Sequence, residues 1–258
     1  MKRLCPKLVN FKKSKKMLKK IDNSKKLGNQ HISILYPGLE LSDSDTGYYS
    51  IGRIDQAHIQ GGAVIKMHPH VNDDILSYFR SGKVKHTDSE GFTEYITPTK
   101  LMLMKAGKMF YHEEAILEEQ EGLQIFIRPG EKDSQPEVIF QELEEVHSIN
   151  EWRLIASPDK SKTVLELSSQ TWIYDMQITP GKVFSLPEEV NKEFHCLLYV
   201  FQGSMVVNDN IELGKGESIF IKDEIISFQT SDRAELVLFV TDTKSPYYDG
   251  GMYSGNQK

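Results

Sequence analysis

The chain has 258 residues, of which 39% are hydrophobic, and a formal net charge of −6. A chain of this length can bury roughly 70–75% of the surface that its unfolded form exposes, so its stability requires neither disulfides nor a structural metal. The charge is unevenly divided, because residues 1–30 carry +10 and the remainder carries −16. The acidic body argues against direct binding of nucleic acid, because contacts to phosphates need a basic surface.

The basic segment 1–30 contains ten Lys and one Arg against a single acidic residue, Asp22. This composition is typical of a solvated leader, and we expect it to be disordered and outside the fold. It has no apolar stretch of signal-peptide length. Apolar runs elsewhere fall far short of the roughly 20 residues that a membrane-spanning helix needs, so we expect no membrane association. Cys5 and Cys196 give no disulfide framework, which favours a cytoplasmic location.

From His31 onward, short apolar segments alternate with turns that contain glycine, which is the pattern of an all-β protein with few short helices. One acidic stretch, Gln141–Asn150, has apolar residues three apart and is predicted to form a short helix. The expected strands are 63–67, 83–86, 92–96, 101–104, 123–127, 163–167, 171–178, 197–202, 203–207, 216–222 and 236–241.

The second half of the chain repeats the first weakly. Residues 78–84 can be superposed on residues 200–206, and residues 99–103 on residues 216–220. This repeat predicts two tandem barrels of about 100 residues each, at 31–147 and 148–242, followed by a C-terminal tail at 243–258. Because two barrels in one chain can cover each other's apolar faces, we expect a monomer.

Two short motifs carry the candidate chemistry. In a strand, His68 and His70 of the sequence His-Pro-His point to the same side, and Pro69 places them at a strand edge. His112 and Glu114 share one side in the same way. Either pair alone is more often a surface or turn feature, but three imidazoles and one carboxylate on one wall could hold a divalent transition metal with open positions.

The spacing of these motifs resembles the pirin family of the cupin superfamily. The second half of the chain, with Leu-Ile-Ala-Ser-Pro at 154–158 and Gly-Glu-Ser-Ile-Phe-Ile-Lys-Asp-Glu at 216–224, looks closer to the bacterial branch of that family. The resemblance covers about Gly62 to Pro129 and lies in Met-His-Pro-His at 67–70, Gly82, His-Thr-Asp-Ser-x-Gly at 86–91, Ile-Thr-Pro at 96–98 and Lys-Ala-Gly-x4-His-x-Glu at 105–114. It implies a bicupin, that is, two double-stranded β-helix (jelly-roll) barrels. It also implies that His68, His70, His112 and Glu114 of the N-terminal cupin bind one metal ion. Iron(II) is the expected metal, although Mn, Ni, Co, Cu and Zn also suit these ligands.

The chain departs from the family pattern after the ligand pair. The family usually continues His-Pro-His-Arg-Gly-Phe-Glu, whereas this chain has Val-Asn-Asp-Asp at 71–74, which changes the expected shape of the pocket entrance. In the second barrel the positions equivalent to the ligands are Glu189, Asn191, Gln229 and Ser231, and His195 matches Asp74, so we expect no metal site there.

The resemblance implies a mononuclear metal-dependent dioxygenase of the quercetinase type, which uses O2 to cleave a flavonol-like or other enolisable small molecule. Glu114 would be a ligand and the base that takes the substrate's hydroxyl proton. One alternative is a non-enzymatic regulator that binds a protein partner according to the redox state of its metal, and another is a bicupin with an empty site. His86 and Asp88 lie at a predicted hairpin, where they are expected to cap the turn.

Overall fold

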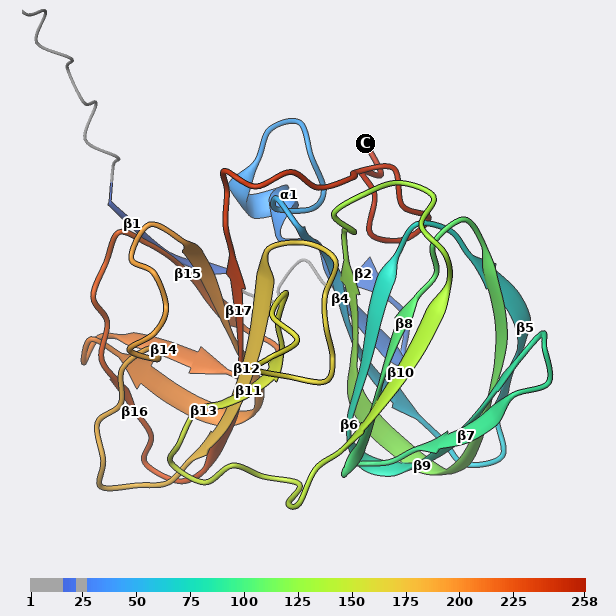
Figure 1. The fold of residues 1–258 in the computed structure, drawn as a ribbon. Coiled ribbons are helices and arrows are strands. Elements are labelled where there is room, and N and C mark those ends of the chain that lie inside the picture. Colours follow the sequence, from blue (N-terminus) through green and yellow to red (C-terminus); the bar gives the residue numbers. More distant parts are fainter. Residues whose placement is uncertain (1–15, 22–26) are drawn as a thin grey trace, which may run out of the picture.

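The computed structural model describes residues 16–21 and 27–258 of the chain. These residues form two antiparallel sheets, each curled into a barrel, and the barrels lie side by side (Figure 1). The N-terminal barrel contains β2 (Leu27–Gly28), β3 (Ile32–Leu35), β4 (Ile51–Ile59), β5 (Val64–His70), β6 (Asp74–Asp88), β7 (Thr93–Ile96), β8 (Lys100–Lys105), β9 (Phe110–Ile127) and β10 (Glu137–Glu142). The C-terminal barrel contains β1 (Met17–Ile21), β11 (Arg153–Ala156), β12 (Thr171–Ile178), β13 (His195–Val207), β14 (Ile211–Gly214), β15 (Ser218–Lys222), β16 (Phe228–Gln229) and β17 (Ala234–Thr241).

The strand order of the N-terminal sheet is β10-β8-β6-β9-β4-β3-β2, with β5 paired to β9 and β7 to β6. The order in the C-terminal sheet is β1-β15-β13-β17-β12-β11, with β14 and β16 paired to β13. One short helix, α1 (Gly38–Leu41), lies between β3 and β4 within the described part of the chain. The prediction of an all-β tandem of barrels is therefore confirmed. No helix in the described ranges is long and apolar enough to cross a membrane.

Alternation along the strands separates three hydrophobic cores among the described residues. In β6, Ile75 and Phe79 pack inside the N-terminal barrel, whereas Leu76 and Tyr78 join a core that also contains residues of the C-terminal sheet. The strand β13 of the C-terminal sheet has the same arrangement. Its residues alternate between the core shared by the two barrels and the core inside the C-terminal barrel. Because side chains of a strand alternate between faces, one strand can serve both its own barrel and the contact between the barrels.

The weak internal repeat has a structural counterpart in two matched glycines. Gly82 and Gly203 both have a positive φ, of +82° and +80°. A Cβ on Gly82 would lie 2.4 Å from Glu119 O, and one on Gly203 would lie 2.0 Å from Arg233 O. Both barrels thus require glycine at the same point of the equivalent long strand, for the conformation and for the close approach.

A buried carboxylate joins the two barrels. Asp175 of β12 is 0% exposed. It accepts hydrogen bonds from Tyr78 Oη at 2.7 Å and Arg80 Nη2 at 2.5 Å, both on β6. Arg153 of β11 donates to the same carboxylate through Nε at 2.9 Å and Nη2 at 2.7 Å. One anion therefore holds cationic groups from both sheets in the contact between them.

Two predicted elements are wrong. Instead of a helix over Gln141–Asn150, the first two residues belong to β10, which pairs with β8, and Leu143 N–H donates to Thr99 O at 2.7 Å. The carbonyl of Val146 then accepts from Arg80 and Arg153, so tertiary partners replace the helical ones. The predicted strand 163–167 is irregular, with its Thr163 hydroxyl bonded to Ile155 O at 2.9 Å.

The leader is not entirely outside the fold, which corrects the prediction for residues 17–21. These residues form β1, which pairs with β15 over Met17↔Lys222 to Ile21↔Ser218. Ile21 is 2% exposed and belongs to the shared core. The gain from burying apolar side chains in this short strand outweighs the tendency of its lysines to stay solvated. Leu27 and Gly28 of the predicted leader also belong to the fold, because they form β2 and pair with β3. Residues 1–15 and 22–26 of the predicted leader lie outside the described residues.

Candidate metal centre

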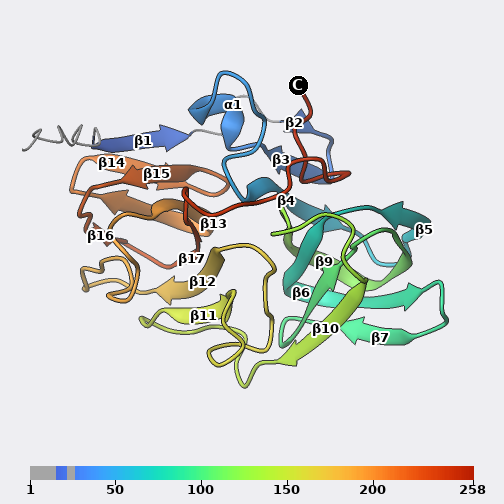
Figure 2. The same ribbon diagram turned by 45° about the horizontal axis from the view of Figure 1, so that its top comes forward.

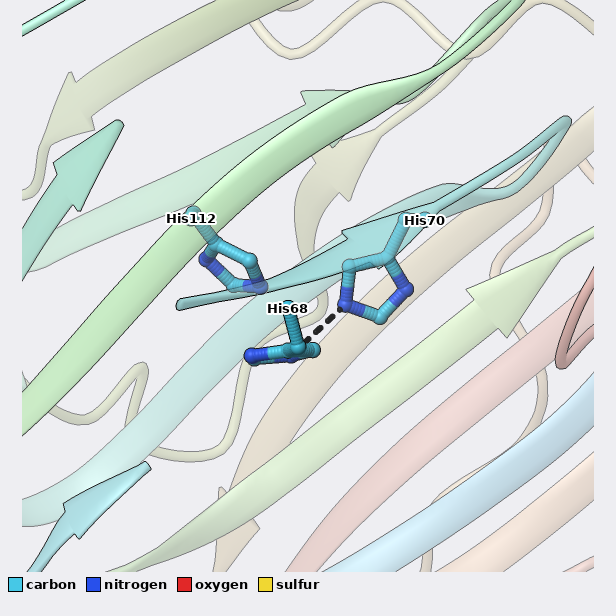
Figure 3. Close-up of side chains that lie close together, drawn as sticks. All are labelled: His68, His70 and His112. Carbon is cyan, nitrogen blue, oxygen red and sulfur yellow. Dashed lines mark hydrogen bonds between the residues drawn. The ribbon is translucent and has the colours of Figure 1, made fainter. Parts of the chain in front are cut away.

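Three histidines meet between β5 and β9. His68 and His70 lie on the same side of β5, and His68 stands opposite His112 in the register with β9. Their rings converge, with centroid distances of 4.5 Å between His68 and His112, 4.9 Å between His68 and His70, and 5.0 Å between His70 and His112 (Figure 3). Pro69 turns the other way and costs no ladder bond inside the sheet, since β5 pairs only with β9 among the described strands.

The ring nitrogens of this group are arranged as ligands. One nitrogen from each of His68, His70 and His112 lies within 4.8 Å of the other two. The Nε2 atoms of His68 and His70 are 3.1 Å apart. Nε2 of His112 is buried and has no hydrogen-bond partner within the described residues. A buried nitrogen without a partner is costly, and a shared cation would satisfy all three.

Glu114 lies on the other side of His112, next to a residue that the sequence prediction did not include. His86 stands opposite Glu114 in the register of β6 and β9. His86, His112 and Glu114 form a second group with metal-ligand spacing. Nδ1 of His112 is 3.2 Å from Nδ1 of His86 and 3.9 Å from Oε1 of Glu114. His112 belongs to both groups, and Glu114 lies beside His112 and His86 rather than within the group of His68, His70 and His112.

Burial gives these side chains unusual protonation. It lowers the pKa of His112 to about 2, with the neighbouring histidines as further causes, and it lowers the pKa of His68 and His86. Burial also raises the pKa of Glu114 to about 7. A neutral imidazole is the form that binds metals, so burial keeps His68 and His112 in the form that can bind a cation. The donor set, the buried nitrogen without a partner and the neutral rings all fit a divalent transition metal.

The nitrogens that point away from the centre meet outer groups. Nδ1 of His68 is 2.9 Å from the carbonyl of Lys66, and Nδ1 of His112 faces His86. Nδ1 of His70 is 3.8 Å from Oδ2 of Asp73. Such contacts fix the orientation and tautomer of a ligating histidine. Nδ1 of His68 and Nδ1 of His112 thus have hydrogen-bond partners, whereas Nδ1 of His70 approaches Asp73 without a hydrogen bond.

The structure separates the roles of the two residues predicted to cap a turn. Asp88 does cap it, because its Oδ1 accepts the N–H groups of Glu90 and Phe92, both at 2.9 Å. His86 does not, because it is 0% exposed and lies beside His112. His86 and Asp88 are two residues apart on one strand, so their side chains point to the same side. This alternation was the only indication in the sequence of where the His86 side chain points. What the sequence does not show is the register that sets β6 against β9.

The two metal-ligand groups found in the described part of the chain both lie in the N-terminal barrel. Absence of a metal from the second barrel, at Glu189, Asn191, Gln229 and Ser231, stays a prediction. His195, which the sequence excluded as a ligand there, is hydrogen-bonded through Nδ1 to Tyr48 Oη at 2.7 Å. Cys196 is a buried thiol whose pKa burial raises to about 12, as expected for an inert side chain.

Comparisons with known proteins agree with this architecture. The pirin family model matches residues 22–127, and the model of the quercetinase C-terminal cupin domain matches residues 154–240. A quercetin 2,3-dioxygenase of Escherichia coli (strain K12) is 25% identical over 197 residues, which cover 75% of this chain and 83% of that protein. The bacterial pirin YhhW of Escherichia coli in complex with nickel(II) is 21% identical, with a TM-score of 0.74 over 89% of this chain and 100% of that chain. A quercetin 2,3-dioxygenase from Acinetobacter baumannii is 18% identical, with a TM-score of 0.71 over 89% of this chain and 88% of that chain. The chain belongs to the pirin family of bicupin proteins.

Proposed function

We propose that the protein is a mononuclear metal-dependent dioxygenase of the quercetinase type, which acts on a flavonol-like or other enolisable small molecule. The observation that carries the proposal is the convergence of three imidazole nitrogens, one of them buried without a protein partner, beside the carboxylate of Glu114. Support comes from the relatives named quercetin 2,3-dioxygenase. The presence of only two cysteines in the sequence, of which Cys196 is a free buried thiol, also favours a cytoplasmic location.

His68, His70 and His112 would hold the metal, and Glu114, which lies beside Nδ1 of His112, would turn toward it as the fourth donor. Iron(II) is the metal we propose, and Mn, Ni, Co, Cu and Zn remain alternatives because a His3Glu set suits each of them. The nickel complex of a related bacterial pirin supports a divalent transition metal in this fold. A bound metal would supply charge stabilisation for the substrate's deprotonated hydroxyl and a meeting point with O2.

The residues of the chain would supply proton transfer and access. On loosening from the metal, Glu114 would take the hydroxyl proton of the substrate, and burial, which raises its pKa to about 7 in the metal-free chain, suits it to this role. His70 and His112 are buried, whereas His68 is half-buried. Substrate would therefore approach on the side of His68, and the buried pair would keep the far side of the centre dry.

Metal analysis of the purified chain, followed by oxygen uptake with quercetin, tests the proposal. The wild-type chain should bind one divalent metal and consume O2, and the variants His68→Ala and His112→Ala should lose both properties. His58→Ala is the matched control, because His58 is exposed and bonded to Glu119 at the surface. Metal binding without O2 uptake, whether Fe, Mn, Ni, Co or Cu is bound, would contradict the flavonol-cleaving activity. It would favour the alternative of a regulator that binds a protein partner. A chain that binds no metal would refute the site itself.

A further inference from the structure

The segment that follows β17 leaves the C-terminal barrel and crosses to the N-terminal barrel (Figures 1 and 2). There, residues 251–254 lie against the loop that follows the ligand strand β5. Met252 N–H donates to Val71 O at 2.9 Å. A Cβ on Gly251 would lie 2.4 Å from Asn72 O, so this approach of backbone to backbone requires glycine. The segment is therefore packed directly on the loop that replaces the family's Arg-Gly-Phe.

Asp73 of this loop is the anchor of the segment. Its carboxylate is buried, and Oδ1 accepts hydrogen bonds from the N–H of Ser254 at 2.8 Å and from its hydroxyl at 2.6 Å. The N–H of Tyr253 reaches Oδ2 at 3.1 Å. These three donors all come from the segment 251–254. They set the direction of the carboxylate, because a buried anion must keep its hydrogen bonds.

Arg128 fixes the same segment from the other side. Its guanidinium is buried and forms a double hydrogen bond to Asp45, at 2.6 and 2.7 Å. Its Nε donates to the carbonyl of Ser254 at 2.9 Å. Ser254 is thus held at its N–H and hydroxyl by Asp73 and at its carbonyl by Arg128. Two buried charges of opposite sign secure one residue of a segment that lies outside both family-model matches.

The anchored carboxylate faces a residue of the metal centre. Oδ2 of Asp73 is 3.8 Å from Nδ1 of His70, a buried nitrogen that has no hydrogen-bond partner within the described residues. The ring of Tyr253 lies 5.1 Å from that of His70, centroid to centroid, and 5.5 Å from that of Phe126. An anion beside Nδ1 favours the tautomer that carries hydrogen there, which leaves the lone pair on Nε2, toward His68.

We propose that residues 251–254 and Asp73 together form a positioning element for His70. The segment sets the direction of the Asp73 carboxylate, the carboxylate selects the Nδ1–H tautomer of His70, and the Tyr253 ring limits rotation of the imidazole. Asp73 and Tyr253 are positioning residues, since they act through His70. The inference deepens the proposed function, because the nitrogen so presented is one of the three assigned to the metal.

The first test uses the metal-free, full-length chain with ¹⁵N-labelled histidine, in chelator. Nuclear magnetic resonance reports which ring nitrogen carries the hydrogen, and a His70→Gln sample assigns the signals. We expect the Nδ1–H tautomer in the wild type. In Asp73→Asn the amide oxygen can still accept from Ser254 while the amide NH2 faces His70, so the tautomer should reverse to Nε2–H. A chain that ends at Asp249 should give a mixture of both.

Asp74→Asn is the matched control, because Asp74 is a buried neighbour that binds Ser168 and not the segment. It should keep the wild-type tautomer. The inference is overturned if wild-type His70 is the Nε2–H tautomer, or if Asp73→Asn leaves the tautomer unchanged. Should the shortened chain fail to fold, Ser254→Ala, which removes only the hydroxyl donor, replaces it and should shift the tautomer in the same direction.

The second test measures Co²⁺ binding and its visible spectrum. Loss of an outer partner of a ligating histidine typically weakens metal affinity by about 10–100-fold, and we expect this of Asp73→Asn, with a changed spectrum, but not of Asp74→Asn. An affinity of Asp73→Asn within about twofold of wild type would overturn the positioning role. If the wild type binds neither Co²⁺ nor Ni²⁺, the metal site fails, whereas the tautomer measurement still decides the positioning of His70.

Discussion

Replacement of Glu114 by Gln should stabilise the metal-free protein at high pH. Glu114 is 3% exposed, and burial raises its pKa from 4.5 to about 7. The amide of Gln124 approaches its carboxylate at 3.4 and 3.5 Å, which is at the limit of a hydrogen bond. Ionised Glu114 therefore lacks the partners that a buried anion needs when no cation is bound.

The sign and the size follow from the two pKa values. A group whose pKa is raised on folding contributes stability below its unfolded pKa, and this stability is lost as the pH rises through the folded pKa. A difference from 4.5 to about 7 corresponds to about 3 kcal/mol, lost between pH 4.5 and pH 8. Glutamine is uncharged at every pH, so Glu114→Gln should avoid this loss. The opposite loss that His112 causes at low pH, because its pKa is lowered, is common to both proteins and cancels in their difference.

Urea unfolding of both proteins in chelator, at pH 4.5 and at pH 8, measures the effect. The two unfolding free energies should nearly coincide at pH 4.5, and the variant should be more stable by about 3 kcal/mol at pH 8. Glu118→Gln is the control on the same strand, since Glu118 is exposed, and it should not change the pH dependence. A difference between Glu114→Gln and wild type that is the same at both pH values would refute the assignment of Glu114 as a buried, unpartnered carboxylate.

Three further substitutions test the framework by urea unfolding. Asp175→Ala leaves the guanidinium groups of Arg80 and Arg153 without their shared anion between the barrels and should cost about 3–5 kcal/mol; a cost below about 1 kcal/mol would contradict the ion cluster. Ile21→Ala should cost about 2–4 kcal/mol and leave Co²⁺ affinity unchanged, because β1 packs in the shared core away from the histidines; an unchanged stability would place residues 17–21 outside the fold, as the composition first indicated. Gly82→Ala should destabilise by more than about 1 kcal/mol through its positive φ and the contact with Glu119 O, and a neutral result would contradict that geometry.

The fold was predictable because its signals are local. The segments 101–104 and 171–178 contain short apolar runs bounded by turns, and they lie in β8 and in β12, respectively. The prediction of a helix over Gln141–Asn150 was wrong because it rested on the apolar spacing within the segment. That spacing contains no information about β8, with which the first two residues of the segment pair. A local sequence pattern therefore predicts a strand well where the pattern also indicates the neighbouring strand. It predicts poorly where pairing with a strand distant in the sequence determines the structure.

The candidate metal centre was predictable only where its residues lie close together in the sequence. His68 and His70 follow from alternation on one strand, and so do His112 and Glu114. Placement of the first pair opposite the second needed the family resemblance, because the register of β5 and β9 cannot be derived from either motif alone. His86 was missed for this reason, since its neighbour His112 lies on another strand, 26 positions away in sequence.

The contacts that Asp73 makes beside the centre could not be predicted, because their partners lie far away in the sequence. Asp73 looks like an ordinary turn residue in the sequence, and only the fold brings Ser254 to it, 181 positions later. Segments near each end of the chain pack on the barrel that is distant in sequence. The N-terminal strand β1 pairs within the sheet of the C-terminal barrel, and residues 251–254 pack on the N-terminal barrel. Asp73, which departs from the family pattern next to the metal-ligating pair, therefore indicates a structural contact particular to this chain, and its partner lies far away in the sequence. The Val-Asn-Asp-Asp sequence at 71–74 and the segment 251–254 are best understood as one structural unit, and a change in either should be felt at His70.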